Sequence, residues 1–163
     1  MQNLPQTGSV EWIGIRPGKR QAIRECESVY INETGLEGDR YNGRSGKRSV
    51  TLIQAEHIDV IAALLHREQV HPAELRRNIV VNGINLLALK DKTFCIGGAI
   101  LKMTGLCHPC SRMEEVFGAG GYNAVRGHGG ITASVIQPGY VCLKDTVSMN
   151  MASDGIIDRA DGS

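Results

Sequence analysis

The chain has 163 residues, enough for one domain with a substantial core, and 42% of them are hydrophobic. Its net charge of +1 argues against a general nucleic-acid or membrane-surface binder, although it allows a local cationic pocket. No apolar run reaches about 18 residues and the N-terminus lacks the pattern of a signal peptide, so we expect a cytoplasmic protein that binds neither nucleic acid nor membrane.

Short strands are expected in the first half of the chain. Residues 10–16 and 25–32 are rich in β-branched and aromatic residues and partly alternate, which predicts two strands. The glycine-rich, charged segment 33–48 predicts a loop, and residues 49–54 predict a further strand. Residues 55–68 repeat apolar side chains at the helical period, which predicts an amphipathic helix.

The second half continues mainly with strands. Pro72 suits a first helical turn, and the β-branched residues 79–81 predict a strand that ends at an Asn-Gly turn. Residues 92–105 predict two strands around a Gly-Gly bend, and residues 131–149 predict two more around a Pro-Gly turn. Many short strands with few helices and no regular alternation of the two predict a predominantly β, barrel-like domain.

One domain accounts for most of the chain. We expect residues 10–149 to form it, preceded by an N-terminal extension over residues 1–9. Residues 150–163 are small and polar, which predicts a flexible C-terminal tail.

The stretch TGLCHPCSRMEEV places Cys107 and Cys110 three positions apart. A structural zinc site would need further ligands in a second cysteine or histidine pair, and only isolated histidines are available. A thioredoxin-like couple would need a βαβ context, which the pattern does not show. A c-type haem motif would need a histidine where Ser111 stands. Zinc and a redox pair are therefore the weaker alternatives.

A single reactive thiol explains this stretch better. Ser111 and Glu114 have the spacing of a capping box, which predicts a helix from Ser111 to about Phe117. Cys110 would then lie at the helix N-terminus, where the helix dipole favours a thiolate that can act as nucleophile, sulfur carrier or metal ligand. A buried structural cysteine stays an alternative, and the involvement of Cys107 is open.

Basic residues recur in the glycine-rich loops and before a predicted strand. Arginine forks and the bare backbone N–H groups of glycine loops suit a phosphate or another anion. A solvated surface would explain each segment separately, and the sequence does not establish that they converge. The residues concerned are Arg40, Arg44, Lys47, Arg48, Arg76, Arg77 and Arg126.

In their order, these motifs resemble the MOSC domain, the module named for the C-terminal part of molybdenum cofactor sulfurase, and in particular its small stand-alone bacterial members. The similarity runs from about Val10 to Met149. It rests on GLEGDRY, SVTLIQAEHI, LRRNIVVNGINL, and IGGAILKMTG followed by a Pro-Cys pair.

The resemblance implies a β-barrel-like fold that holds a molybdenum cofactor, with Cys110 as the metal-ligating thiolate. The family's Arg-x-Asn element, which contacts the pterin phosphate, corresponds to Arg76 and Asn78. The segment before the cysteine lines the same phosphate. The expected cofactor-binding residues are therefore Asp39, Arg40, Arg76, Arg77, Asn78, Cys107, His108 and Arg126.

Three functions follow as hypotheses. The leading one is an oxidoreductase module that acts on N-hydroxylated compounds and receives electrons from a partner protein. The alternative is a sulfur or cofactor carrier that uses a Cys110 persulfide, serves cofactor-biosynthesis proteins and has no turnover of its own. The third is a structural domain without cofactor. Because the chain is close to a bare MOSC module, its autonomous catalysis is left open.

Overall fold

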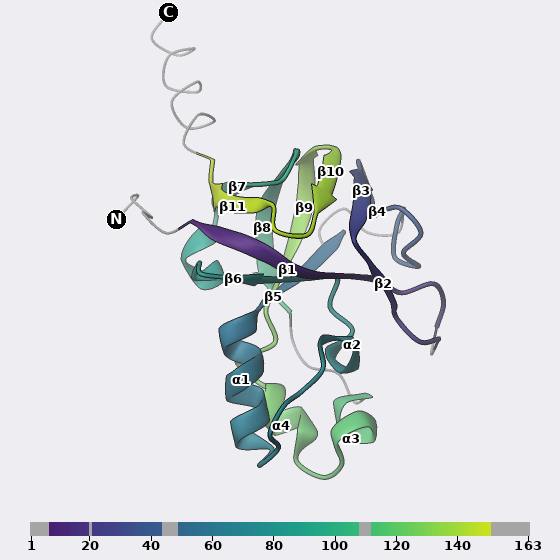
Figure 1. Ribbon diagram of the computed structural model, residues 1–163, viewed down its shortest axis with the longest axis vertical. Helices are drawn as coiled ribbons and strands as arrows, with labels where there is room; N and C mark the ends of the chain where they lie inside the picture. The colour runs from purple at the N-terminus through teal and green to yellow at the C-terminus, as the bar shows by residue number, and fades with distance from the viewer. Residues whose placement is uncertain (1–6, 20, 44–48, 108–111, 151–163) are drawn as a thin grey trace, which may run out of the picture.

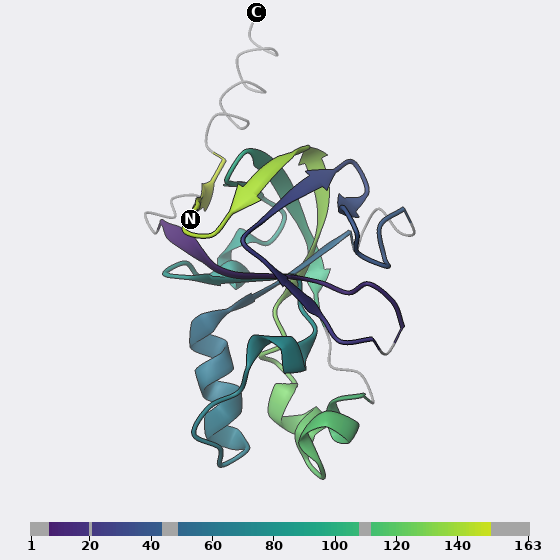
Figure 2. The same cartoon turned by 45° about the vertical axis from the view of Figure 1, so that its right-hand side comes forward.

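The computed structural model describes residues 7–19, 21–43, 49–107 and 112–150. Strands form a barrel, and the α-helices gather at one end of it in both views (Figure 1 and Figure 2). In chain order the elements are β1 (Gly8–Ile15), β2 (Arg24–Cys26), β3 (Ser28–Asn32), β4 (Gly35–Leu36), β5 (Val50–Gln54), α1 (Ala55–Leu64), α2 (Pro72–Leu75), β6 (Ile79–Asn82), the 3₁₀ helix η2 (Leu86–Leu89), β7 (Thr93–Ile96), β8 (Ala99–Leu106), α3 (Arg112–Phe117), α4 (Gly121–Val125), β9 (Ile131–Gln137), β10 (Gly139–Cys142) and β11 (Thr146–Met149).

The main sheet closes on itself. Its strand order is β11-β7-β8-β9-β5-β6-β1-β2, and an additional pairing of β1 with β11 closes a barrel of seven strands. The pairs in this sheet are antiparallel except β5 and β6, which run parallel. A small second sheet has the order β10-β3-β4. The predicted predominantly β, barrel-like fold is confirmed.

Buried side chains form two clusters, one inside the barrel and one between the barrel and the helices. Strand β6 contributes to both, because successive side chains of a strand point to opposite faces. Ile79 and Val81 join the first cluster, whereas Val80 joins the second. Ile58 and Ile61 of α1 cover that outer face. Full burial of one such side chain contributes about 1.5–3 kcal/mol.

Two predicted elements differ from the structure. The helix predicted for residues 55–68 ends at Leu64, because His66 adopts a positive φ of 57° that a helix cannot continue. The strand predicted for residues 25–32 is split at Glu27, where the chain leaves the barrel for the small sheet. Strand β2 pairs with β1, and β3 pairs with β10.

A parallel crossover places the segment that precedes β6. Strand β5 leads through α1 and α2 into β6, which returns beside β5 in the same direction. Helix α2 ends at Arg76, whose left-handed backbone (φ 57°, ψ 28°) turns the chain into the strand. The sequence did not reveal this parallel pair, since short helices and loops fill the crossover. The start of β6 thereby lies beside the end of β1, as the pairing of Ile13 with Ile79 shows.

Candidate anion-binding site

A buried ion pair forms the base of the site. Arg16 follows the last residue of β1, and its Nε and Nη2 donate to Oδ1 and Oδ2 of Asp39 at 3.0 and 2.9 Å. The two side chains are 9% and 1% exposed. Burial raises the pKa of Asp39, but hydrogen bonds from Arg16 and its positive charge outweigh burial and hold that pKa below its ordinary value of 3.8. Asp39 is therefore ionised and compensates the charge of Arg16.

Asn78 connects this pair to the barrel. Its Oδ1 accepts hydrogen bonds from Nη2 of Arg16 and from the backbone N–H and hydroxyl of Thr51, each at 3.1 Å. Its Nδ2 donates to the carbonyl oxygen of Gly14 and to Oδ1 of Asp39, both at 3.1 Å. These bonds use the full capacity of a side-chain amide. The Asn78 side chain therefore holds its neighbours in place.

Two further arginines meet at this point. The backbone N–H of Arg40 donates to the carbonyl oxygen of Arg16 at 2.7 Å. Arg16 Nη1 reaches the carbonyl oxygen of Arg76 at 3.4 Å, and Arg76 Nη1 donates to the carbonyl oxygen of Gln21 at 2.6 Å. Asp39, Arg40, Arg76 and Asn78, all predicted for the site, thus gather around Arg16. Sequence reasoning missed Arg16 itself, for which the one signal was an arginine at the end of the strand predicted for residues 10–16.

Arg77 lies nearby in a different environment. Its side chain is buried, and Nε and Nη1 donate to the carbonyl oxygens of Gly129 and Leu75 at 2.8 and 2.9 Å. The backbone N–H of the buried Cys107 donates to the carbonyl oxygen of Gly130 at 2.8 Å. Arg77 and Cys107 thus fix the glycine-rich loop before β9 from two sides.

The remaining predicted residues divide into two groups. Arg126 follows α4 and is exposed. Among the described residues, no hydrogen bond or ion pair joins its side chain to the cluster around Arg16. Cys110 and His108 lie outside the described residues, as do Ser111 and the basic residues Arg44, Lys47 and Arg48.

Helix α3 follows the cysteine motif as predicted, but Glu114 has a further partner that the sequence did not reveal. Its carboxylate accepts from the backbone N–H groups of Gly120 and Tyr122, at 3.2 and 2.7 Å. Glu114 therefore binds the N-terminal turn of α4. The Ser111 half of the predicted capping box lies outside the described residues.

Two histidines connect α1 to the glycine-rich loop. The ring centroids of His57 and His128 are 5.6 Å apart. Burial lowers the pKa of His57, the charge of His128 lowers it further, and Glu56 partly opposes both. Both imidazoles are half-buried, so protonation of His57 brings a positive charge into the contact between helix and loop.

The free energy of unfolding should therefore decrease as the pH is lowered. The unfolded chain takes up the His57 proton near its ordinary pKa of 6.5, whereas the folded chain takes it up only at lower pH. The stability contributed by neutral His57 is complete above pH 6.5 and decreases as the pH falls below that value. The decrease levels off below the pKa of His57 in the folded chain. Urea unfolding at about pH 7 and about pH 5 should show a smaller loss for His57→Gln than for the wild type. His66→Gln, an exposed control on the same segment, should keep the full loss; an equal loss in His57→Gln would contradict the assignment.

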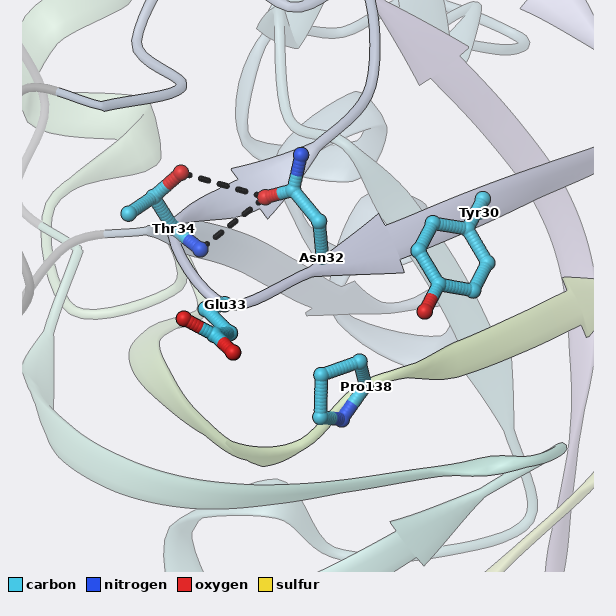
Figure 3. Close-up of a pocket in the computed structure, with 5 residues that line it drawn as sticks. All are labelled: Tyr30, Asn32, Glu33, Thr34 and Pro138. Atoms are coloured by element: carbon cyan, nitrogen blue, oxygen red, sulfur yellow. Dashed lines mark hydrogen bonds between the residues drawn. The ribbon is translucent and has the colours of Figure 1, made fainter.

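A pocket lies beside the small sheet. It is an open pocket of about 300 Å³ lined by Tyr30, Asn32, Glu33, Thr34 and Pro138. Figure 3 shows the backbone nitrogen and the hydroxyl of Thr34 directed at Oδ1 of Asn32, at 2.9 and 3.1 Å. None of the predicted site residues lines this pocket.

In the described part of the chain, no group of three or more His, Cys, Asp or Glu side chains is placed to bind a metal ion. Over the same residues, every helix is too short or too polar to cross a bilayer.

One comparison with known proteins identifies a family. The model of the MOSC domain matches residues 37–148. A comparison with curated proteins finds no match. Among solved structures, the YuaD protein from Bacillus subtilis is 21% identical with a TM-score of 0.81, and the alignment covers 90% of this chain and 98% of that one.

Two further solved structures are similar. YiiM from Escherichia coli is 21% identical, with a TM-score of 0.66 and coverage of 89% of this chain and 69% of that one. YiiM from Geobacillus stearothermophilus is 13% identical, with a TM-score of 0.72 and coverage of 88% and 75%. At these identities the likeness shows a shared fold.

Proposed function

The chain belongs to the MOSC domain family, a family associated with molybdenum-cofactor proteins, and from this membership and the arginine cluster we propose that it binds a molybdenum cofactor. One observation carries the proposal. Arg16, Arg40 and Arg76 come from three separate segments and meet at one place. A structural need for one buried ion pair does not account for three arginines there.

The charges of the cluster suit a phosphate. Asp39 compensates Arg16, and Arg40 adds a second guanidinium, which lies over the Tyr41 ring. Guanidinium groups bind phosphate oxygens through parallel N–H donors. Because the Asn78 side chain is fully bonded within the protein, its role is to hold Arg16 and Asp39. The residues present therefore fit the phosphate of a pterin cofactor.

The metal end of the cofactor is assigned through the family motif. Cys110 stands at the Pro-Cys position, and its thiolate is a soft ligand suited to a redox-active metal. When bound, the cofactor supplies two-electron redox chemistry at its metal. The protein binds and orients it, and the reaction class that we propose is the reduction of N-hydroxylated compounds.

Metal and pterin content test the proposal. Protein from a molybdenum-replete host that makes the cofactor should contain molybdenum and pterin in near-stoichiometric amounts. Cys110→Ser should lose the metal, and Arg76→Gln should lose both. Lys90→Gln, an exposed cation outside the cluster, should retain both.

Two outcomes would contradict the proposal. Wild-type protein without molybdenum and pterin would overturn cofactor binding, and molybdenum retained by Cys110→Ser would overturn the assigned ligand. Mass spectrometry of the same samples separates the carrier role, because a persulfide adds about 32 Da to Cys110. Empty protein that carries this adduct would support sulfur transfer instead.

A further inference from the structure

One aromatic ring contacts two arginines of the anion site. The Cζ atom of Arg16 lies 4.5 Å from the centroid of the Tyr41 ring, and that of Arg40 lies 4.7 Å from it. Both distances are within the roughly 6 Å over which a guanidinium is attracted to an aromatic face. The ring is 38% exposed, so it lies at the surface end of the cluster. Tyr41 is thus a side chain that two cations share.

The backbone fixes where this ring stands. The Tyr41 N–H donates to Oδ2 of Asp39 at 3.2 Å, and the Arg40 N–H donates to the carbonyl oxygen of Arg16 at 2.7 Å. The consecutive residues 39–41 therefore wrap around Arg16, and the buried carboxylate that holds Arg16 also holds the start of Tyr41.

The two arginines depend on the ring to different degrees. Arg16 is already fixed by Asp39 and Asn78. Within the described residues, the cation–π contact with Tyr41 is the one contact found for the Arg40 guanidinium. Ordering a free arginine side chain costs conformational entropy, and a site that has ordered it beforehand binds its ligand more tightly.

We propose that Tyr41 is a positioning residue whose ring face holds the Arg40 guanidinium beside Arg16 at the surface end of the cluster, where Arg40 acts on the anion. This inference rests on the proposed function, because it assigns the anion site to these arginines. The ring face matters here and the hydroxyl does not. Phenylalanine at position 41 should therefore preserve the positioning of Arg40, and leucine should not.

Titration with inorganic pyrophosphate tests the inference without any cofactor. Binding to cofactor-free protein is followed by calorimetry and by the Nε–H NMR signals of Arg16 and Arg40. Tyr41→Leu should weaken binding by about threefold to fivefold and move both Nε–H signals, since a lost cation–π contact corresponds to about 0.5–1 kcal/mol. Tyr41→Phe should bind within about twofold of the wild type. Tyr122→Leu, a control tyrosine that is 39% exposed outside the cluster, should bind like the wild type.

The outcomes separate this inference from the proposed function. If Tyr41→Leu binds pyrophosphate like the wild type, or Tyr41→Phe is as weak as Tyr41→Leu, the positioning role is wrong. If the wild type contains no pterin but these variants differ as expected, the cofactor proposal fails and the role of Tyr41 stands. Wild-type protein that does not bind pyrophosphate at all overturns the inference.

Discussion

Replacement of Asp39 by alanine should destabilise the fold by about 3–5 kcal/mol, because it leaves the Arg16 guanidinium buried without its counter-charge. The same change removes acceptors for the Arg16 and Tyr41 backbone N–H groups and for Nδ2 of Asn78. Urea unfolding followed by circular dichroism measures the loss. Glu37→Ala removes an exposed carboxylate from the same loop and should change stability by less than about 0.5 kcal/mol.

The effect of pH tests the same pair. The depressed pKa of Asp39 means that its stabilisation is full above the unfolded value of 3.8 and is lost as the pH falls through the lower folded pKa. Asp39→Ala should therefore flatten the acid end of the stability profile. A double variant, Arg16→Met with Asp39→Leu, should be less destabilised than Asp39→Ala, since it leaves no buried charge. If Asp39→Ala is as stable as the wild type, the ion pair does not support the site.

Gly130→Ala should be more disruptive than a typical glycine substitution, with a loss of at least about 3 kcal/mol. Gly130 has a φ of 90°, and a Cβ there would overlap the carbonyl oxygen of Leu52, a backbone atom of β5 that cannot rotate away. The loop before β9 would have to move, and it carries the acceptor for the Cys107 N–H. Thermal and urea unfolding should both show the loss.

Gly127→Ala is the matched control. Its φ of 83° is nearly the same, yet a Cβ at this position would meet no atom within 4 Å. Its free energy of unfolding should decrease only by the cost of an alanine in the left-handed conformation, about 1–2 kcal/mol. The difference between the two variants measures the close approach of the loop to β5. Equal losses would mean that backbone conformation alone determines both.

Local patterns predicted those elements that depend on local contacts. The Gly-Gly bend between β7 and β8 was visible because its strands pair with each other directly. The break at Glu27 was not, since β2 pairs with residues 9–13 positions earlier in β1, whereas β3 pairs with residues 108–114 positions later in β10. The end of α1 was placed four residues too late, because apolar side chains continue past the point where the backbone turns at His66.

The candidate site was predictable where residues form a motif. Asp39, Arg40, Arg76 and Asn78 stand in recognisable strings, and the structure brings them together. Arg16 lies outside these strings, and Thr51, which stands in SVTLIQAEHI, was not predicted for the site. Their roles follow from a parallel strand pair and a buried hydrogen-bond network, neither of which is encoded by spacing along the chain.

The pairing of β1 with β11 has a consequence for the folding rate. It joins Gly8 to Val147 and Ser9 to Thr146, contacts that span most of the chain length. Contacts of such wide separation are slow to form, because a long segment of chain must be ordered before they can stabilise anything. We expect the seven strands to associate first as an open, curved sheet, with closure of the cylinder among the last steps before the native state.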